Sequence, residues 1–209
     1  MAYRNGSRCA GRRFGHGSLL LAVLFLAVTP AISADDTKSA TIDATAMGTS
    51  TQLGKMFSVK VIIEQFSTPE DRRVFVDAFK KGQSQGLVDA LSKAKPVGRI
   101  AITGTVGTDL TYIGLTRTPT GRRIRFATNR PIRIGEAMNA GPSTAYNLTA
   151  GEFDINDSDK DKSTGVLFPA AQLIINKKGE LQWELRQNPW KLVNIIDWNK
   201  AGSEAQPLN

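Results

Sequence analysis

Alternation of apolar and polar residues is the strongest pattern along this chain. A strand places successive side chains on opposite faces, so an apolar residue at every second position predicts a strand with one buried face. Residues 56–66 show this pattern most clearly, and residues 41–47, which alternate small and polar side chains, predict a weak strand at best. The apolar members of the clearer segment are Phe57, Val59, Val61 and Ile63.

From residue 97 onward, short segments of strand character are separated by links rich in Gly, Asn, Asp and Pro, which favour turns. Short links imply antiparallel pairing, because a parallel crossover needs about a dozen residues or more. The strands predicted in this half cover residues 98–103, 110–117, 122–128, 144–155, 165–175, 180–186 and 192–198.

Residues 67–96 carry a helical period instead. Thr68 is a suitable N-cap, Pro69 suits the first helical position, and two acids follow in the first turn. We expect this helix to end at Gly82 and a second helix to cover residues 84–94. The apolar side chains at helical spacing are Val74, Phe75, Ala78, Phe79, Leu87, Val88 and Leu91.

These elements predict an α+β fold. We expect a curled antiparallel sheet of seven or eight strands, arranged as a sandwich or an open barrel. A two-helix insertion follows the first long strand and packs on one face of the sheet. We expect one globular domain over residues 35–199 and a flexible polar tail over residues 200–209.

The first 34 residues have the organisation of a signal peptide. Four arginines and no acid precede an apolar run of ten residues, and Pro30 separates that run from small residues. The run is too short for a membrane-spanning helix, which needs about 20 residues. We expect cleavage after Ala34, or alternatively after Ser33, and a periplasmic or secreted protein without a membrane span. The pair Arg12-Arg13 leaves twin-arginine export open.

Removal of this leader changes the charge balance of the chain. The full sequence has 27 Lys and Arg against 19 Asp and Glu, a net charge of +8. Four of the basic residues lie in the leader, which leaves 23 against 19 and a net charge of +4. A nucleic-acid-binding domain normally shows a stronger basic excess, so we expect no nucleic-acid partner.

Removal of the leader also restricts the available chemistry. The sole cysteine and the sole histidine, Cys9 and His16, both lie within it. A chain without them has no Ser-His-Asp triad, no cysteine nucleophile, no disulfide bond and no structural zinc site. We therefore predict no metal, no cofactor and no catalytic residue. Glycoside hydrolysis by two carboxylates remains compatible with the composition.

Six arginines fall within residues 117–133. Residues 118–121, Thr-Pro-Thr-Gly, form a favourable four-residue turn, which predicts a hairpin with Arg117 opposite Arg122 and Gly114 opposite Arg125. Gly114 then leaves space beside that arginine. In this register, the side chains facing the core are Ile113, Leu115, Ile124 and Phe126, and those on the other face are Tyr112, Arg123 and Arg125.

Two interpretations of this hairpin are open. Guanidinium groups suit carboxylate, phosphate or sulfate, so the hairpin is a candidate site for an anionic ligand. The alternative is a solvated strand face whose charges prevent pairing of sheet edges. The candidate ligand-binding residues are Tyr112, Arg123, Arg125, Arg130 and Arg133.

Residues 157–163 place oxygen-bearing side chains at alternate positions, as calcium loops do. An EF-hand also needs Gly at its sixth position and Glu at its twelfth, and this loop has Lys162 and Phe168 there. We expect a plain hairpin connection without a bound metal.

Three tryptophans lie close together near the end of the chain. Trp183 shares a strand face with Leu181 and Leu185, which predicts a core position. Trp190 and Trp198 are consistent with core closure or with stacking on sugars or lipid. Separately, no spacing singles out a catalytic pair among the candidate carboxylates Glu64, Asp109, Glu136, Glu152 and Asp154.

Four segments resemble a family of uncharacterised exported bacterial proteins, a domain of unknown function. They are residues 62–71 (IIEQFSTPED), 96–100 (PVGRI), 121–124 (GRRI) and 128–132 (TNRPI), and the similarity extends over residues 59–185. This chain has Phe66 where the family has Trp, and Asn129 where Asp is usual. The resemblance implies one exported domain and provides no catalytic residue.

These observations favour an exported, non-catalytic domain that binds an anionic or amphipathic ligand, or an anionic partner in the cell envelope, through the arginine-rich hairpin. The alternatives are a carboxylate-based, glycosidase-like hydrolase and a purely structural envelope protein. A closed apolar cavity with an arginine at its mouth would favour ligand binding, two carboxylates about 5–10 Å apart in a deep cleft would favour hydrolysis, and a filled core with a flat surface would favour a structural or partner-binding role.

Overall fold

The computed structural model describes residues 39–134, 145–177, 179 and 181–199. The predicted leader and the predicted tail lie outside the described residues, as does Glu136. The described residues belong to one compact unit, Ala31–Asn209.

Within the described residues the chain forms ten strands, one α-helix and two short 3-10 helices. In chain order the elements are β1 (Ala40–Gly48), η2 (Ser50–Gln52), β2 (Met56–Ile63), α1 (Pro69–Lys93), β3 (Gly98–Ile102), β4 (Thr108–Leu110), β5 (Tyr112–Thr118), β6 (Gly121–Thr128), β7 (Leu148–Asn156), η4 (Lys160–Lys162), β8 (Thr164–Ile175), β9 (Leu181–Leu185) and β10 (Trp190–Asp197).

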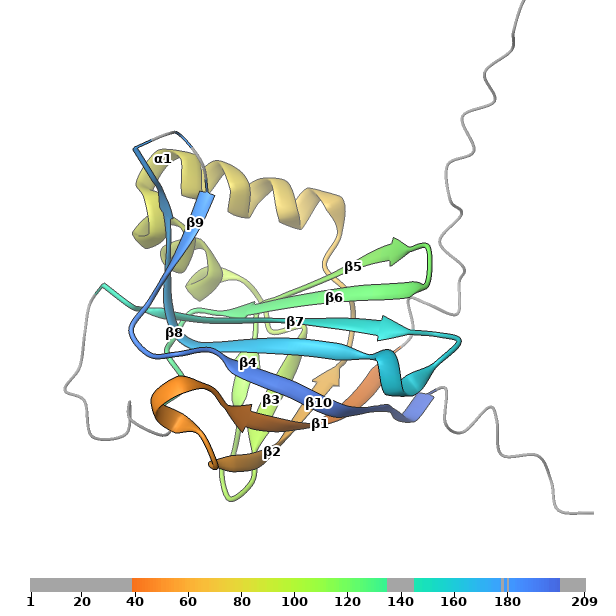
Figure 1. Ribbon diagram of the computed structural model, residues 1–209. Coiled ribbons are helices and arrows are strands. Elements are labelled where there is room, and N and C mark those ends of the chain that lie inside the picture. The colour runs from red at the N-terminus through yellow and green to blue at the C-terminus, as the bar shows by residue number, and fades with distance from the viewer. Residues whose placement is uncertain (1–38, 135–144, 178, 180, 200–209) are drawn as a thin grey trace, which may run out of the picture. The chain divides into compact units, whose positions relative to one another are not determined.

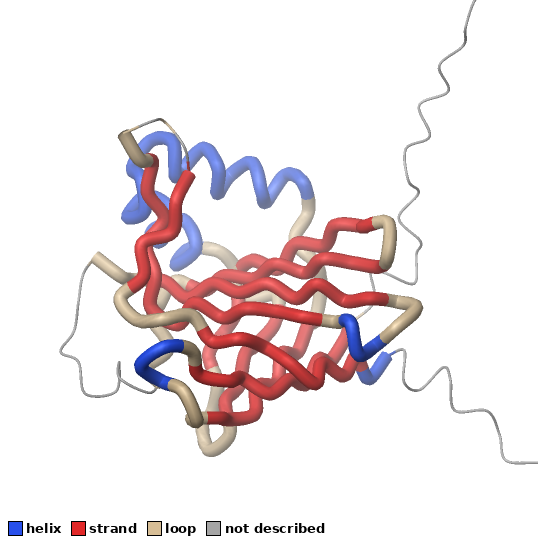
Figure 2. Tube along the Cα trace, viewed as in Figure 1, coloured by secondary structure: helices blue, strands red, loops and turns tan. Residues whose placement is uncertain are grey.

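The strands form a single antiparallel sheet in the order β4-β3-β2-β1-β10-β8-β7-β6-β5, with β9 added to the C-terminal half of β8. The two ends of this order, β4 and β5, are joined in the chain by Thr111 alone. The Thr111 backbone N donates to the Ala127 backbone O on β6 at 3.2 Å. The sheet therefore curls into a nearly closed barrel (Figures 1 and 2).

Inward side chains from nearly all the strands form one apolar core. On β1, Ile42, Ala44 and Ala46 are buried while the residues between them are not, which is the two-residue period of a strand. Trp190 on β10 is 1% exposed and packs against Phe57 on β2, with ring centroids 4.6 Å apart. Each large apolar side chain buried in this way contributes roughly 1.5–3 kcal/mol to folding.

The predicted register of the arginine hairpin is confirmed. Arg117 pairs with Arg122, and Gly114 pairs with Arg125. Ile113, Ile124 and Phe126 are buried, and Leu115 packs against the same core. The turn at residues 118–121 therefore determines which side chains enter the barrel.

Helix α1 lies against the outside of the barrel (Figure 1). Its start is as predicted: the Thr68 side chain accepts from the Asp71 backbone N at 3.1 Å, and the Asp71 carboxylate accepts from the Thr68 backbone N at 2.8 Å. This capping box satisfies donors that the first helical turn leaves unpaired. No helix among the described residues combines the length and the apolar character needed to cross a membrane.

The predicted fold class is wrong in two respects. The insertion after β2 is one helix, α1, rather than two, and the predicted end of the first helix at Gly82 is a kink inside it, where Gly82 and Gln83 leave helical dihedral angles. The sheet has ten strands rather than seven or eight, since residues 40–48 form a full central strand and an additional short strand, β4, ends at Leu110, with only Thr111 between it and β5. The protein is mainly an antiparallel sheet, and α+β describes it only loosely.

Candidate functional site

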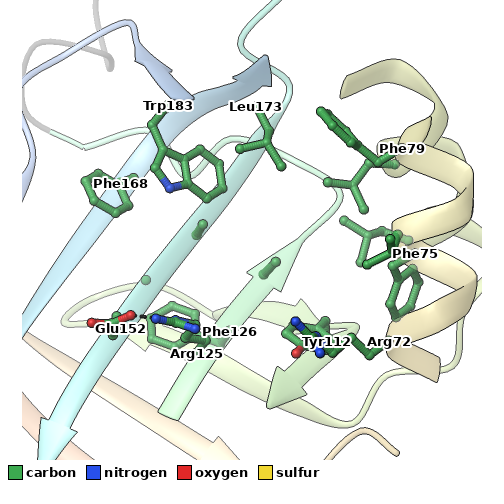
Figure 3. A pocket seen from close by; sticks show the side chains of 16 residues that line it. Arg72, Phe75, Phe79, Tyr112, Arg125, Phe126, Glu152, Phe168, Leu173 and Trp183 are labelled. Carbon is green, nitrogen blue, oxygen red and sulfur yellow. Dashed lines mark hydrogen bonds and ion pairs between the residues drawn. The ribbon is translucent and has the colours of Figure 1, made fainter. Parts of the chain in front are cut away.

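A groove of about 290 Å³ lies between α1 and the outer face of the sheet (Figure 3). Its floor follows from the strand register. Tyr112, Ala127, Ala150 and Phe168 are cross-strand neighbours on β5, β6, β7 and β8. The two central positions carry only methyl groups, so the sheet is hollow between the rings of Tyr112 and Phe168.

Aromatic and aliphatic side chains wall the groove on both sides. Phe75 and Phe79, one helical turn apart on α1, point toward the sheet (Figure 3). On the opposite side, Trp183 of β9 stacks on Phe168, with ring centroids 5.7 Å apart and an interplanar angle of 21°. Leu173 of β8 also contributes to this side. The groove therefore has an apolar floor and apolar walls.

Tyr112 is the aromatic residue at the hairpin end of the floor. Its ring meets Phe75 edge-on, with centroids 5.8 Å apart and planes at 83°. Its hydroxyl lies over Gly114, where a side chain would collide with it. The space that the sequence predicts beside Arg125 is thus occupied by Tyr112, and Gly114 is needed for this close approach.

Charged groups gather at one end of the groove. Arg72 extends from the first turns of α1 toward Tyr112 (Figure 3). Arg125 and Glu152 lie directly opposite each other on β6 and β7, and Arg125 Nε donates to Glu152 Oε2 at 2.6 Å. Among the described residues, no ion pair or side-chain hydrogen bond engages Arg72. The mouth thus carries two guanidinium groups and one carboxylate.

Arg123 lies next to this mouth and is occupied by acids. Its Nε and Nη2 donate to the two oxygens of Asp154 at 3.1 and 2.5 Å, and its Nε lies 3.3 Å from Glu152 Oε1. The hydrogen bonding to Asp154, with the nearby charge of Glu152, raises the pKa of the Arg123 guanidinium. Arg123 and Arg125 are therefore members of a cross-strand ion-pair network.

Arg122 is separate from the groove and buried at another end of the barrel. Its side chain is 8% exposed, and its Nη2 donates to Asp197 Oδ2 at 2.5 Å. Its Nε donates to Asp157 Oδ1 at 3.2 Å, and Arg117 Nη1 donates to the second oxygen of the same carboxylate at 3.2 Å. Arg117 and Arg122 thus belong to one ion-pair network around Asp157, whereas Arg123 and Arg125 lie on the outer face of the sheet.

The structure brings two of the five predicted ligand-binding residues into the groove. Tyr112 and Arg125 line it, and Arg123 lies beside it. Arg130 and Arg133 follow β6, are exposed, and are not among the described residues that line the groove.

The sequence reasoning missed Arg72 and Trp183. Arg72 lies three residues before Phe75, so the helical period places both on one side of α1, a signal that was available. The predicted core position of Trp183 is wrong: its side chain is 37% exposed and walls the groove. Of the other tryptophans, Trp190 is in the core, and Trp198 Nε1 donates to Asp43 Oδ2 at 2.7 Å.

The acidic loop connects β7 to β8 through η4, which agrees with the predicted hairpin connection. Lys162 Nζ lies 3.0 Å from Asp159 Oδ2, and hydrogen bonding from Lys162 lowers the pKa of the Asp159 carboxyl. A lysine therefore takes the place beside Asp159 that a cation would need. Across the described residues, no group of three or more His, Cys, Asp or Glu side chains could hold a metal ion.

No family model, curated protein or solved structure matches this chain. The groove is therefore interpreted from its own geometry and charge.

Proposed function

We propose that this protein is a binding domain whose groove holds a small amphipathic molecule with an apolar body and an anionic head group. The observation that carries the proposal is the combination of a methyl-lined hollow, flanked by aromatic side chains, with Arg72 at its mouth. Small-molecule sites are typically concave and apolar, with a few polar groups that orient the ligand.

The charges at the mouth favour an anionic head group. Glu152 neutralises Arg125 through their 2.6 Å hydrogen bond, which leaves Arg72 as the excess positive charge among the described lining residues. A carboxylate or sulfonate placed there can accept from the Arg72 guanidinium without competing against an acidic side chain.

The size of the groove limits the ligand. A water molecule accounts for about 30 Å³ of the liquid, so 290 Å³ encloses roughly ten heavy atoms, and the remainder of a larger ligand extends out of the groove. Each buried methylene contributes about 0.8 kcal/mol, and association costs several kcal/mol in lost freedom. We therefore expect dissociation constants in the micromolar range or weaker.

Hydrolysis has less support from the groove. Glu152 is the only carboxylate among its described lining residues, and it is paired with Arg125. Glycosidases use two carboxylates on either side of the bond that is cleaved.

The proposal is tested with the fluorescent anion anilinonaphthalene sulfonate as the reporter and decanoate and decanol as competitors. The two competitors have the same chain length and differ in head-group charge. Decanoate should displace the reporter at a concentration several-fold lower than decanol. In Arg72→Ala, the decanoate affinity should fall about fivefold to tenfold, because an exposed charge-assisted contact contributes about 1 kcal/mol. Decanol should be unaffected.

Two matched variants control this experiment. Arg73→Ala removes the adjacent arginine, which is exposed, lies 3.5 Å from Glu70 and does not line the groove. Ala150→Leu fills the floor, whereas Ala101→Leu places the same side chain on β3, away from the groove. We expect Ala150→Leu alone to abolish reporter binding. Equal binding by Ala150→Leu and Ala101→Leu, or no binding by the wild type, would refute the proposal and favour a structural role.

A further inference from the structure

Two loops meet at one end of the barrel. Strands β1 to β4 are consecutive antiparallel neighbours, so the β1–β2 loop and the β3–β4 turn emerge at the same end of the sheet. Thr103, at the start of the turn, donates from its backbone N to the Ser58 backbone O at 3.1 Å. Figures 1 and 2 show both loops at the bottom of the view, away from α1.

These loops and the first residue of β2 carry the three most exposed large apolar side chains of the described residues. Leu53 is 77% exposed, Met56 is 65% exposed, and Val106 is 87% exposed. We refer to these three residues as the apolar end. Scattered exposed apolar residues are ordinary on a protein surface, but a group of them at one end of a sheet is typical of an interaction surface.

The β1–β2 loop inverts the usual order of burial. Gln52 is 0% exposed, and the next residue, Leu53, is almost fully exposed. Hydrogen bonds to residues 188 and 189 hold the loop in this state: Thr49 Oγ1 donates to the Pro189 backbone O at 2.5 Å, and Asn188 Nδ2 donates to Thr51 Oγ1 at 3.0 Å. Leu53 is thus presented to solvent by an ordered loop.

The charge around the apolar end is positive. Residues 48–56, 103–107 and 187–192 contain Lys55 and Lys191 and no acid. Both lysines are exposed; Lys191 lies opposite Met47 at the start of β10, beside the same loop, and on its other side it lines a pocket that also contains Asp157, Asp161 and Asp197. Asp109 on β4, at this edge of the sheet, is paired with Arg99 at 3.0 Å. Exposed apolar side chains next to lysines are suited to a lipid surface that carries negative charge.

We propose that the apolar end docks on an anionic lipid surface, with Leu53, Met56 and Val106 entering the interface and Lys55 and Lys191 contacting the head groups. This surface lies outside the groove, and the proposal is independent of the ligand that the groove binds.

The test uses the full chain and two kinds of vesicle, one of phosphatidylcholine alone and one of equal parts phosphatidylcholine and phosphatidylglycerol. Amide hydrogen exchange is measured with and without vesicles. The protected amides identify the segment that contacts the lipid, which distinguishes the two loops from any other part of the chain. We expect the anionic vesicles to protect amides of residues 49–56 and 103–107, and protection should weaken as salt is added.

A matched pair of double variants completes the test. Leu53→Ser with Met56→Ser should lower co-sedimentation with anionic vesicles about tenfold or more. Val74→Ser with Ile175→Ser changes two other exposed apolar residues and should leave that binding unchanged. All four side chains are exposed, so we expect every variant to fold.

Three results would overturn the proposal. One is an absence of protection in the two loops with anionic vesicles. Another is equal co-sedimentation by the two double variants. The third is a dimer, detected by analytical ultracentrifugation without vesicles, that only Leu53→Ser with Met56→Ser dissociates, because the occupant of this surface would then be a second copy of the chain.

Discussion

The contrast between Arg122 and Arg125 provides the sharpest test of the structure. The two residues are three positions apart on β6, yet the Arg122 side chain is 8% exposed and the Arg125 side chain is 56% exposed. Arg122 bridges Asp157 and Asp197, and the Asp197 side chain is only 6% exposed. Among the described residues, Arg125 pairs with Glu152 alone, at the edge of the groove.

We expect Arg122→Ala to lower the free energy of unfolding by about 3–5 kcal/mol. It removes two charge-assisted hydrogen bonds, each contributing about 1.5–3 kcal/mol, and leaves the Asp197 carboxylate buried without its cation. Arg125→Ala should cost about 1 kcal/mol or less, because exposed ion pairs contribute little to stability.

The measurement is urea unfolding followed by tryptophan fluorescence and far-ultraviolet circular dichroism. In a thermal scan the Arg122→Ala loss corresponds to a melting temperature roughly 10 °C lower, since 1 kcal/mol shifts a domain of this size by about 2–4 °C. A third variant, Arg122→Met with Asp197→Leu, replaces both charges by apolar groups and should recover most of the loss.

The result that would refute this reasoning is equality of the two single variants. If Arg122→Ala costs no more than Arg125→Ala, Arg122 is not enclosed by Asp157 and Asp197. If Arg125→Ala is the more damaging change, the faces of β6 are exchanged, because a shift of one residue in register moves every side chain to the other face.

Two further predictions follow from the helix break and from the leader. Gln83 is exposed and has φ of 53° and ψ of −146°, so Gln83→Gly should raise the free energy of unfolding by about 0.5–1 kcal/mol in urea titrations. As the control, Lys81→Gly in the preceding helical turn should lower the free energy of unfolding by about 1 kcal/mol. A loss of stability in Gln83→Gly would contradict the backbone angles described. We expect the predicted leader to be removed on export and the mature protein to begin at Asp35, which mass spectrometry of protein from the periplasm or the medium checks. An intact chain that begins at Met1 would refute both the predicted leader and the net charge of +4 derived from it.

Local features could be predicted from the sequence because their causes lie within a few residues. The turn at residues 118–121 determines which hairpin side chains face the core, and the capping residues Thr68 and Asp71 determine where α1 begins. The weakest prediction of this kind was β1, whose alanines have a low preference for strands. They are buried because β1 lies between β2 and β10, near the large ring of Trp190.

The candidate site depended on contacts between distant parts of the chain. The hollow floor requires Ala127 to lie beside Ala150, and residues 129–147, which separate β6 from β7, are too many to set this register as a hairpin turn of two to five residues would. The same pairing places Glu152 against Arg125 and Asp154 against Arg123, which neutralises two of the four arginines that the sequence indicated as an anion site.

The sequence by itself determined the composition, the turn chemistry, the helix start and the alternation along individual strands, because these depend on the intrinsic preferences of each residue and its close neighbours. Only the tertiary structure decided which arginine is buried, which are paired, and that the groove forms beneath α1. Closure of the barrel brings Asp197 to Arg122, 75 positions apart in the chain, and the packing of α1 turns a flat strand face into a cavity. Such contacts depend on the arrangement of all ten strands at once, and no short segment of the sequence carries that information.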